Sequence, residues 1–317
     1  MTAATIVAPE EDARAVRYRD AEAAVWRRYG LSPTERFVQV GSPPTRVRVV
    51  DVGSGPPLLV AHGTFGNGPA FAALVRELPD RRWLLVDRPG WGFSSPLDYR
   101  AETFAGTIAD LQRDVLDALG VELADAAGHS IGGVYALRLA QRHPRRVRRV
   151  VLLGAGPMVD AADPPALIRL MASPVGRVML QMIKRRRLTE GMIRGSGHGS
   201  SIDDGRIPAV IIDWRRAVNR ETDAMRHERA MIRAFMGRHG WRPGLTLSDA
   251  DLAGIHHETL MLYGTGDSVG SPTTWRRMAD TMPNARLSIF EGVGHMLWLD
   301  DPKRVAAEMR VFLDEYS

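Results

Sequence analysis

The fold is decided by the stretch Gly128-His129-Ser130-Ile131-Gly132-Gly133, which has the pattern G-x-S-x-G. The apolar residues at 123–127 predict a strand before it, and the apolar spacing over 134–140 predicts a helix after it. A chain that turns this sharply has no room for side chains two residues before or after the serine, hence the glycines. The turn lifts the Ser130 hydroxyl above the sheet edge, where the first N–H groups of the helix favour negative charge. A chance glycine–serine turn is the alternative.

Short apolar strands alternate with helical patterns on both sides of this motif, which predicts a mostly parallel sheet covered by helices on both faces. The expected strands are 37–40, 47–52, 58–61, 83–86, 123–127, 147–153, 260–263 and 287–290. The expected helices are 71–78, 103–119, 134–140, 274–282 and 302–313.

The alternation stops after the sixth expected strand, and residues 158–255 show helical patterns without a convincing strand. We therefore expect one α/β core, formed by 37–157 and 256–317, with a helical cap at 158–255 inserted into it. Residues 1–36 are expected to form an N-terminal appendage, with an amphipathic helix over 11–29.

Ser130 needs a base, because a free serine hydroxyl is a weak nucleophile. His295 lies in Gly292-Val293-Gly294-His295-Met296, directly after the last expected strand. Sites in such sheets form beyond the carboxyl ends of the strands, so His295 is expected at the same edge as Ser130.

The base needs an acid to orient it, and Asp267 follows the expected strand at 260–263. The resulting order of serine, aspartate and histidine is the one that accompanies a G-x-S-x-G turn. Asp160 and Asp163, just after the strand at 147–153, are the alternative acids.

The glycine-rich segment 62–66 also follows a strand end and can present a backbone N–H to an oxyanion. We expect the N–H groups of Thr64 and Ile131 to form this hole, with Phe65 as the alternative to Thr64. Phe65, His129 and Trp298 are the candidate substrate contacts, although His129 also suits a structural role.

Composition excludes several classes of protein. The 317 residues contain no cysteine, which rules out disulfides, thiolate-bound metals and a cysteine nucleophile. The net charge of +5 suggests nucleic acid, but nearly all of the 42 basic side chains are arginines interleaved with acids along the chain. The only dense cluster, 184–187, is expected to be a solvated helix face or an attractor for an anionic substrate. No apolar run is long enough to span a bilayer, so we expect a cytoplasmic protein without a membrane or nucleic-acid partner.

With these motifs in order, the sequence resembles the α/β-hydrolase superfamily and, within it, the capped serine hydrolases. The resemblance covers 37–157 and 256–316 and includes Asp87-Arg88-Pro89-Gly90-Trp91-Gly92. It implies the α/β-hydrolase fold with a triad of Ser130, Asp267 and His295, acting without cofactor or metal. Dehalogenases and epoxide hydrolases of this superfamily carry an aspartate nucleophile, so a serine at 130 argues against both.

The resemblance leaves the substrate open. We expect hydrolysis of a carboxylic ester of a small to medium apolar molecule through an acyl-enzyme on Ser130. The alternatives are a C–C bond or thioester hydrolase, a cyclase or lyase with the same triad, or a non-enzymatic ligand-binding relative. Ring-fission C–C hydrolases often carry Trp after the histidine, where this chain has Met296. Methionines gathered in the cap suit either an adaptable substrate wall or ordinary packing, and 196–201 is expected to be a flexible hinge loop.

Overall fold

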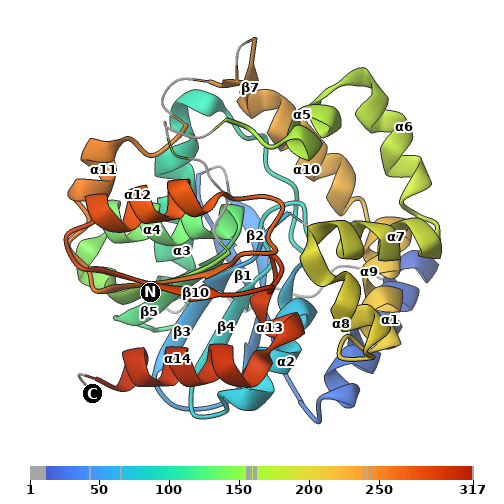
Figure 1. The fold of residues 1–317 in the computed structure, drawn as a ribbon, viewed down its shortest axis with the longest axis horizontal. Coiled ribbons are helices and arrows are strands. Elements are labelled where there is room, and N and C mark those ends of the chain that lie inside the picture. Colours follow the sequence, from blue (N-terminus) through green and yellow to red (C-terminus); the bar gives the residue numbers. More distant parts are fainter. Residues whose placement is uncertain are drawn as a thin grey trace.

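The computed structural model describes residues 12–42, 44–64, 66–154, 159, 163–238, 240–242 and 245–315. An eight-stranded sheet runs through its centre in the order β1-β2-β4-β3-β5-β6-β9-β10 (Figure 1). The strands are β1 Thr34–Val40, β2 Thr45–Val52, β3 Pro57–Ala61, β4 Arg82–Val86, β5 Ala124–His129, β6 Val147–Leu153, β9 Thr259–Gly264 and β10 Ala285–Phe290.

Only β2 runs against its neighbours, pairing antiparallel with both β1 and β4. The other pairs are parallel, which confirms the predicted mostly parallel sheet. Strands β3, β5 and β6 are almost wholly buried, as expected for parallel strands in a sheet covered on both faces.

Helices cover both faces of the sheet, and each face has its own apolar core. One core includes side chains of α3 Phe104–Ala118, α4 Ile131–Arg142, α11 Asp249–Ala253 and α12 Pro272–Thr281. The other includes side chains of α1 Ala13–Arg28, α2 Ala72–Glu77, α13 Leu297–Asp300 and α14 Pro302–Asp314. In the strand order, β5 and the turn that follows it lie in the middle of the sheet.

A helical insert follows β6, as predicted. It contains α5 Ala166–Ala172, α6 Pro174–Met182, α7 Arg186–Ile193, α8 Gly199–Asp203, α9 Ala209–Glu221 and α10 Ala224–Phe235. Two very short strands, β7 Met236–Gly237 and β8 Gly240–Trp241, pair within it, although no strand was expected there. Two residues each give too little periodicity for a pattern to reveal.

The N-terminal helix α1 confirms the expected amphipathic helix and packs against α9 of the insert. Arg17 of α1 pairs with Glu221 of α9 at 2.8 Å. The buried side of α1 packs against the core. There Glu22 accepts hydrogen bonds from the buried guanidinium of Arg48, and the Tyr18 hydroxyl bonds to Asn67. The helix therefore joins the insert to the sheet.

Candidate active site

The turn between β5 and α4 holds Ser130 in a strained conformation. Its φ is +54° and its ψ is −128°, and it is the one non-glycine residue with positive φ among the residues that the structure describes. A Cβ at Gly128 would lie 2.1 Å from the Gly132 carbonyl oxygen, and one at Gly132 would lie 2.0 Å from that of Ala61. Both positions therefore require glycine, and the strain falls on the residue whose hydroxyl is expected to react.

Asp267 and His295 meet where β9 and β10 end. Nδ1 of His295 lies 2.7 Å from Oδ2 of Asp267, and both side chains are buried. The second carboxylate oxygen accepts the Val269 N–H at 2.7 Å, which fixes the carboxylate. Because an ionised carboxylate only accepts, the imidazole proton sits on Nδ1, and Nε2 is the nitrogen able to take a proton.

Of the two alternative acids, the structure describes only Asp163, and it does not place Asp163 as a partner of a histidine. Asp163 is strongly exposed and pairs with Arg169 at 3.1 Å. Asp160 lies outside the described residues.

The loop after β3 packs directly on the serine turn. A Cβ at Gly63 would lie 2.6 Å from Nδ1 of His129 and 2.8 Å from Cβ of Ser130, so only glycine fits there. Nε2 of His62 accepts the Arg88 N–H at 3.0 Å, while Nδ1 donates to the Gly63 carbonyl at 2.8 Å. Burial, together with the Arg88 charge, lowers the pKa of His62 well below its ordinary value, so the ring is neutral and holds the loop.

Thr64 is buried beside this contact, and Ile131 begins α4. The first N–H groups of a helix have no partner within it, so the Ile131 amide is free of the helix ladder. Phe65 lies outside the described residues.

The expected substrate contacts His129 and Trp298 lie in different surroundings. His129 packs against His295, with ring centroids 4.6 Å apart, and is 4% exposed. Burial and the neighbouring His295 lower its pKa well below the ordinary value, so the ring is neutral where it packs against His295.

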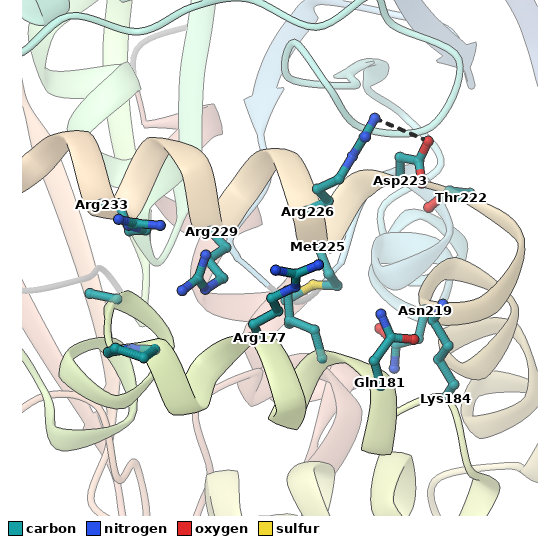
Figure 2. A pocket seen from close by; sticks show the side chains of 13 residues that line it. Arg177, Gln181, Lys184, Asn219, Thr222, Asp223, Met225, Arg226, Arg229 and Arg233 are labelled. Carbon is teal, nitrogen blue, oxygen red and sulfur yellow. Dashed lines mark hydrogen bonds and ion pairs between the residues drawn. The ribbon is translucent and has the colours of Figure 1, made fainter.

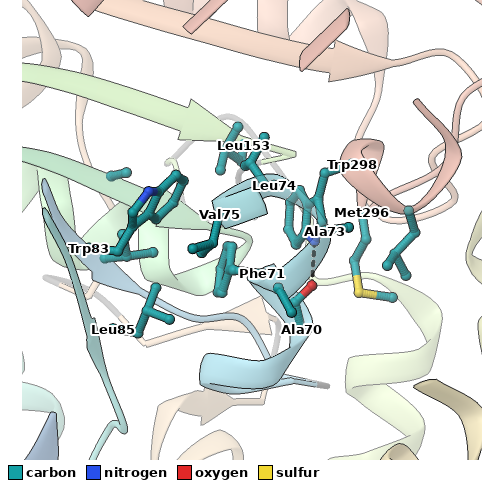
Figure 3. Packing of buried hydrophobic residues seen from close by; sticks show 14 of the residues in the cluster. Ala70, Phe71, Ala73, Leu74, Val75, Trp83, Leu85, Leu153, Met296 and Trp298 are labelled. Carbon is teal, nitrogen blue, oxygen red and sulfur yellow. Dashed lines mark hydrogen bonds between the residues drawn. The ribbon is translucent and has the colours of Figure 1, made fainter. Parts of the chain in front are cut away.

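Trp298 does not reach the substrate space, which corrects our expectation. It has no exposed surface, stacks on Phe71 at 4.8 Å and donates its indole N–H to the Ala70 carbonyl at 2.6 Å (Figure 3). Sequence proximity to His295 suggested contact, but the turn of α13 directs the side chain into the core. Trp298 therefore packs in the core, where its ring contacts His129.

An apolar cavity of about 390 Å³ lies next to the Asp267–His295 pair. Ser268 and Val269 follow the acid, Met296 follows the histidine, and all three line the cavity. Its other walls come mainly from α5, α7 and α9 of the insert, including Met192, Ile211 and Trp214. Ser130, Asp267 and His295 are not part of this lining, so the cavity adjoins the triad residues through their sequence neighbours.

Arg215 of α9 is the cationic side chain in this lining. Burial lowers its pKa to about 9, against the opposing effect of Glu228 and Tyr18. Arg215 therefore stays protonated at neutral pH, in an environment where a bound anion would stabilise its charge.

Residues 194–198 tie the insert to the histidine loop, which the sequence did not reveal. The His295 N–H donates to the Ser196 carbonyl at 2.9 Å, and the Met296 N–H donates to Nε2 of His198 at 3.1 Å. Asp300 accepts hydrogen bonds from His198 Nδ1 at 2.9 Å, from the Gly294 N–H at 2.7 Å and from the hydroxyl of Ser201. Burial raises the pKa of Asp300, but these hydrogen bonds outweigh it and hold the pKa below its ordinary value.

The expectation of a flexible hinge loop at 196–201 is therefore wrong. The segment consists of helical turns with a kink at Gly197, and His198 and Ser201 are buried. The glycines and serines of this segment suggested flexibility. Gly197 is instead required by close packing against the loop that carries Asp267.

The described residues contain no group of three or more histidine and acidic side chains arranged to hold a metal ion. Within that same part of the chain, none of the helices is both long and apolar enough to cross a bilayer.

Comparison with known proteins identifies the family of the chain. The family model described as alpha/beta hydrolase fold matches residues 56–302. Over 285 residues the chain is 30% identical to 2-hydroxymuconate semialdehyde hydrolase of Pseudomonas sp. (strain CF600), covering 85% of this chain and 91% of that protein.

Two solved structures are similar in fold. One is the 2-hydroxy-6-oxo-6-phenylhexa-2,4-dienoate hydrolase of Rhodococcus sp. strain RHA1, with a TM-score of 0.72, 19% identity and coverage of 89% of this chain and 99% of that one. The other is naproxen esterase of Bacillus subtilis, with a TM-score of 0.70, 16% identity and coverage of 96% and 100%.

Proposed function

Since this chain belongs to the alpha/beta hydrolase fold family, we propose that it hydrolyses a carbon–carbon bond beside a carbonyl group, with Ser130 as nucleophile. Two observations support a serine hydrolase: Asp267 contacts His295 at 2.7 Å, and Ser130 is held at positive φ. The similarity to 2-hydroxymuconate semialdehyde hydrolase favours a conjugated hydroxy-oxo acid over the simple ester expected from sequence.

The reaction runs through an acyl-enzyme. Ser130 Oγ adds to the carbonyl carbon while its proton passes to Nε2 of His295, and Asp267 stabilises the imidazolium. The Thr64 and Ile131 N–H groups hold the oxyanion. The carbon–carbon bond then breaks, its electron pair leaves with the conjugated fragment, and His295 protonates that fragment. Water, deprotonated by His295, hydrolyses the ester on Ser130 and releases the acid.

The positive charge of Arg215 in the cavity favours an acidic substrate. A conjugated oxo acid carries a carboxylate, and Arg215 places a buried cation in an otherwise mainly apolar cavity. A carboxylate bound there gains a charge-assisted hydrogen bond from the guanidinium.

Ester hydrolysis is the second candidate, and Met296 favours it. A methionine follows His295 where ring-fission hydrolases often carry tryptophan, and a flexible apolar side chain suits a plain acyl group. The first steps of the two reactions are the same, and they differ in the leaving group.

A direct comparison of substrates tests this choice. We expect kcat/KM on 2-hydroxy-6-oxo-6-phenylhexa-2,4-dienoate, followed by loss of its conjugated absorbance, to exceed that on 4-nitrophenyl butyrate by more than about tenfold, or 1.4 kcal/mol. Turnover of the ester alone would replace the proposal by the second candidate. Ser130→Ala, prepared in the same way, is the control for background hydrolysis.

A further inference from the structure

Helix α6 presents an apolar stripe to the outside of the insert. Val175 and Val178 are each 60% exposed and Met182 is 47% exposed. At 100° per residue these three positions lie within about 60° of one another, so they form one stripe along the helix. Five of the eight strongly exposed large apolar side chains in the described part of the chain lie between residues 170 and 188. Such a concentration marks a surface that meets something apolar.

A basic groove lies beside this stripe, between α6 and α10. Its cavity has a volume of about 650 Å³. In Figure 2, Arg177 from α6 and Arg229 and Arg233 from α10 gather in the groove, with Lys184 at its other end. Burial and the charges of Arg233 and Arg177 lower the pKa of Arg229, which reflects this crowding of like charges.

Little negative charge balances the groove. Asp223 is the one acidic residue in its lining, and it pairs with Arg226 at 3.3 Å (Figure 2). The groove thus keeps a strong excess of positive charge next to an exposed apolar stripe.

We propose that this outer face of the cap, defined by Val175, Val178, Met182 and the groove arginines, docks on the surface of an anionic phospholipid bilayer. An apolar stripe flanked by arginines is the pattern by which helices lie in the membrane interface, with apolar side chains among the acyl chains and basic ones at the phosphates.

Charge favours this occupant over a second copy of the chain. A two-fold dimer through this face would bring the same arginines of both copies together, because each patch meets itself. A bilayer containing acidic lipids supplies both the apolar phase and the negative charge.

The face is close to the apolar cavity proposed to hold the substrate. Asn219 of α9 lines both the groove and the apolar cavity beneath it. Docking therefore brings the lipid phase next to the space proposed for the substrate. The proposed peripheral contact differs from our expectation of no membrane partner, and it needs no membrane-crossing helix.

Vesicle co-sedimentation tests the docking independently of catalysis. We expect binding to vesicles of phosphatidylcholine with 30% phosphatidylglycerol, decreasing with salt, and little binding to phosphatidylcholine alone. At about 1 kcal/mol per basic residue, the double variant R177Q/R233Q should bind about 30-fold more weakly. R145Q/R276Q is the matched control: Arg276 lies on α12 and Arg145 directly before β6, at the strand end away from the insert. This control should bind like the wild type.

Insertion of the apolar stripe needs its own readout. Since the chain has no cysteine, V178C can be labelled with a polarity-sensitive fluorophore at a single site. Its emission should shift to the blue on anionic vesicles. V311C is the matched control, because Val311 on α14 is 63% exposed and lies away from α6 (Figure 1).

Three results would overturn the proposal. They are equal binding of R177Q/R233Q and the wild type, binding of inorganic phosphate without binding of vesicles, and a dimer in light scattering that R177Q/R233Q alters. An equal shift for the labels at 178 and 311 would show that the stripe does not insert.

Discussion

Backbone conformation and proton position at single residues account for the proposed chemistry. Ser130 is held at positive φ by neighbours that must be glycine, and His295 is oriented by the Asp267 carboxylate. These features were predictable, because the G-x-S-x-G turn allows few alternatives. The buried environment of Arg215 was not predictable, since it depends on how α9 packs against the core.

Removing the side chain of either Ser130 or His295 should nearly abolish turnover. We expect Ser130→Ala and His295→Ala each to lower kcat by roughly 10⁶-fold, and the double variant to lose hardly more, because the residues act as a unit. Steady-state kinetics of the three variants is the measurement. Losses that multiply in the double variant would show that the two residues act separately.

Arg215 should select acidic substrates. Arg215→Met is expected to lower kcat/KM on the dienoate by about 10- to 100-fold, since a hydrogen bond to a charged group contributes about 1.5–3 kcal/mol. The neutral 4-nitrophenyl ester should be hydrolysed as before. Arg216→Met, the next residue on α9 and outside the cavity lining, is the control. An equal loss on both substrates would mean that Arg215 has only a packing role.

At the scale of elements, the turn of 194–198 connects the insert to the site. It accepts the His295 N–H and packs on the loop that carries Asp267, so the insert helps to hold the histidine. Glycine and serine residues in sequence give no sign of such packing, because the partners lie far along the chain.

Gly197 tests this connection. Its φ is +95°, and a Cβ would lie 2.2 Å from the Gly266 carbonyl oxygen. Gly205 has a φ of +71° with nothing near its Cβ position, so Gly205→Ala measures the backbone strain alone. We expect Gly205→Ala to cost about 1 kcal/mol in unfolding free energy, and Gly197→Ala at least about 2 kcal/mol more, with loss of activity. Urea denaturation measures both. Equal costs would contradict the close packing.

Across the whole molecule, the mostly parallel sheet and the helical insert after the sixth strand were predictable from apolar periodicity. The docking of α1 on α9, the volume of the cavity and the position of Trp298 were not, because they depend on contacts between distant segments. The buried polar cluster between α1 and the sheet belongs to this second group, with Asp87 accepting from Arg48 at 3.0 Å and from Asn67 at 2.8 Å.

Asp87 should give the folded state a characteristic pH dependence. Burial raises its pKa to about 6, despite the opposing charge of Arg48. A carboxyl whose pKa is higher in the folded state stabilises most below its unfolded pKa, near 4, and this contribution is lost as the pH rises through 6. The stability of the wild type relative to Asp87→Asn should therefore fall by about 2–3 kcal/mol between pH 4 and pH 7.

Urea denaturation across this range is the measurement, and Asp280→Asn, which removes an exposed carboxyl, is the control for loss of charge. A relative stability that rises with pH would mean that the ion pair with Arg48 dominates over burial.

Reaction with a fluorophosphonate, followed by intact-protein mass spectrometry and peptide mapping, tests the central claim most directly. An activated Ser130 should take up one phosphonyl group. His295→Ala should react far more slowly and Ser130→Ala not at all. An unmodified wild type, or an adduct on another serine, would contradict the assignment of Ser130 as the nucleophile.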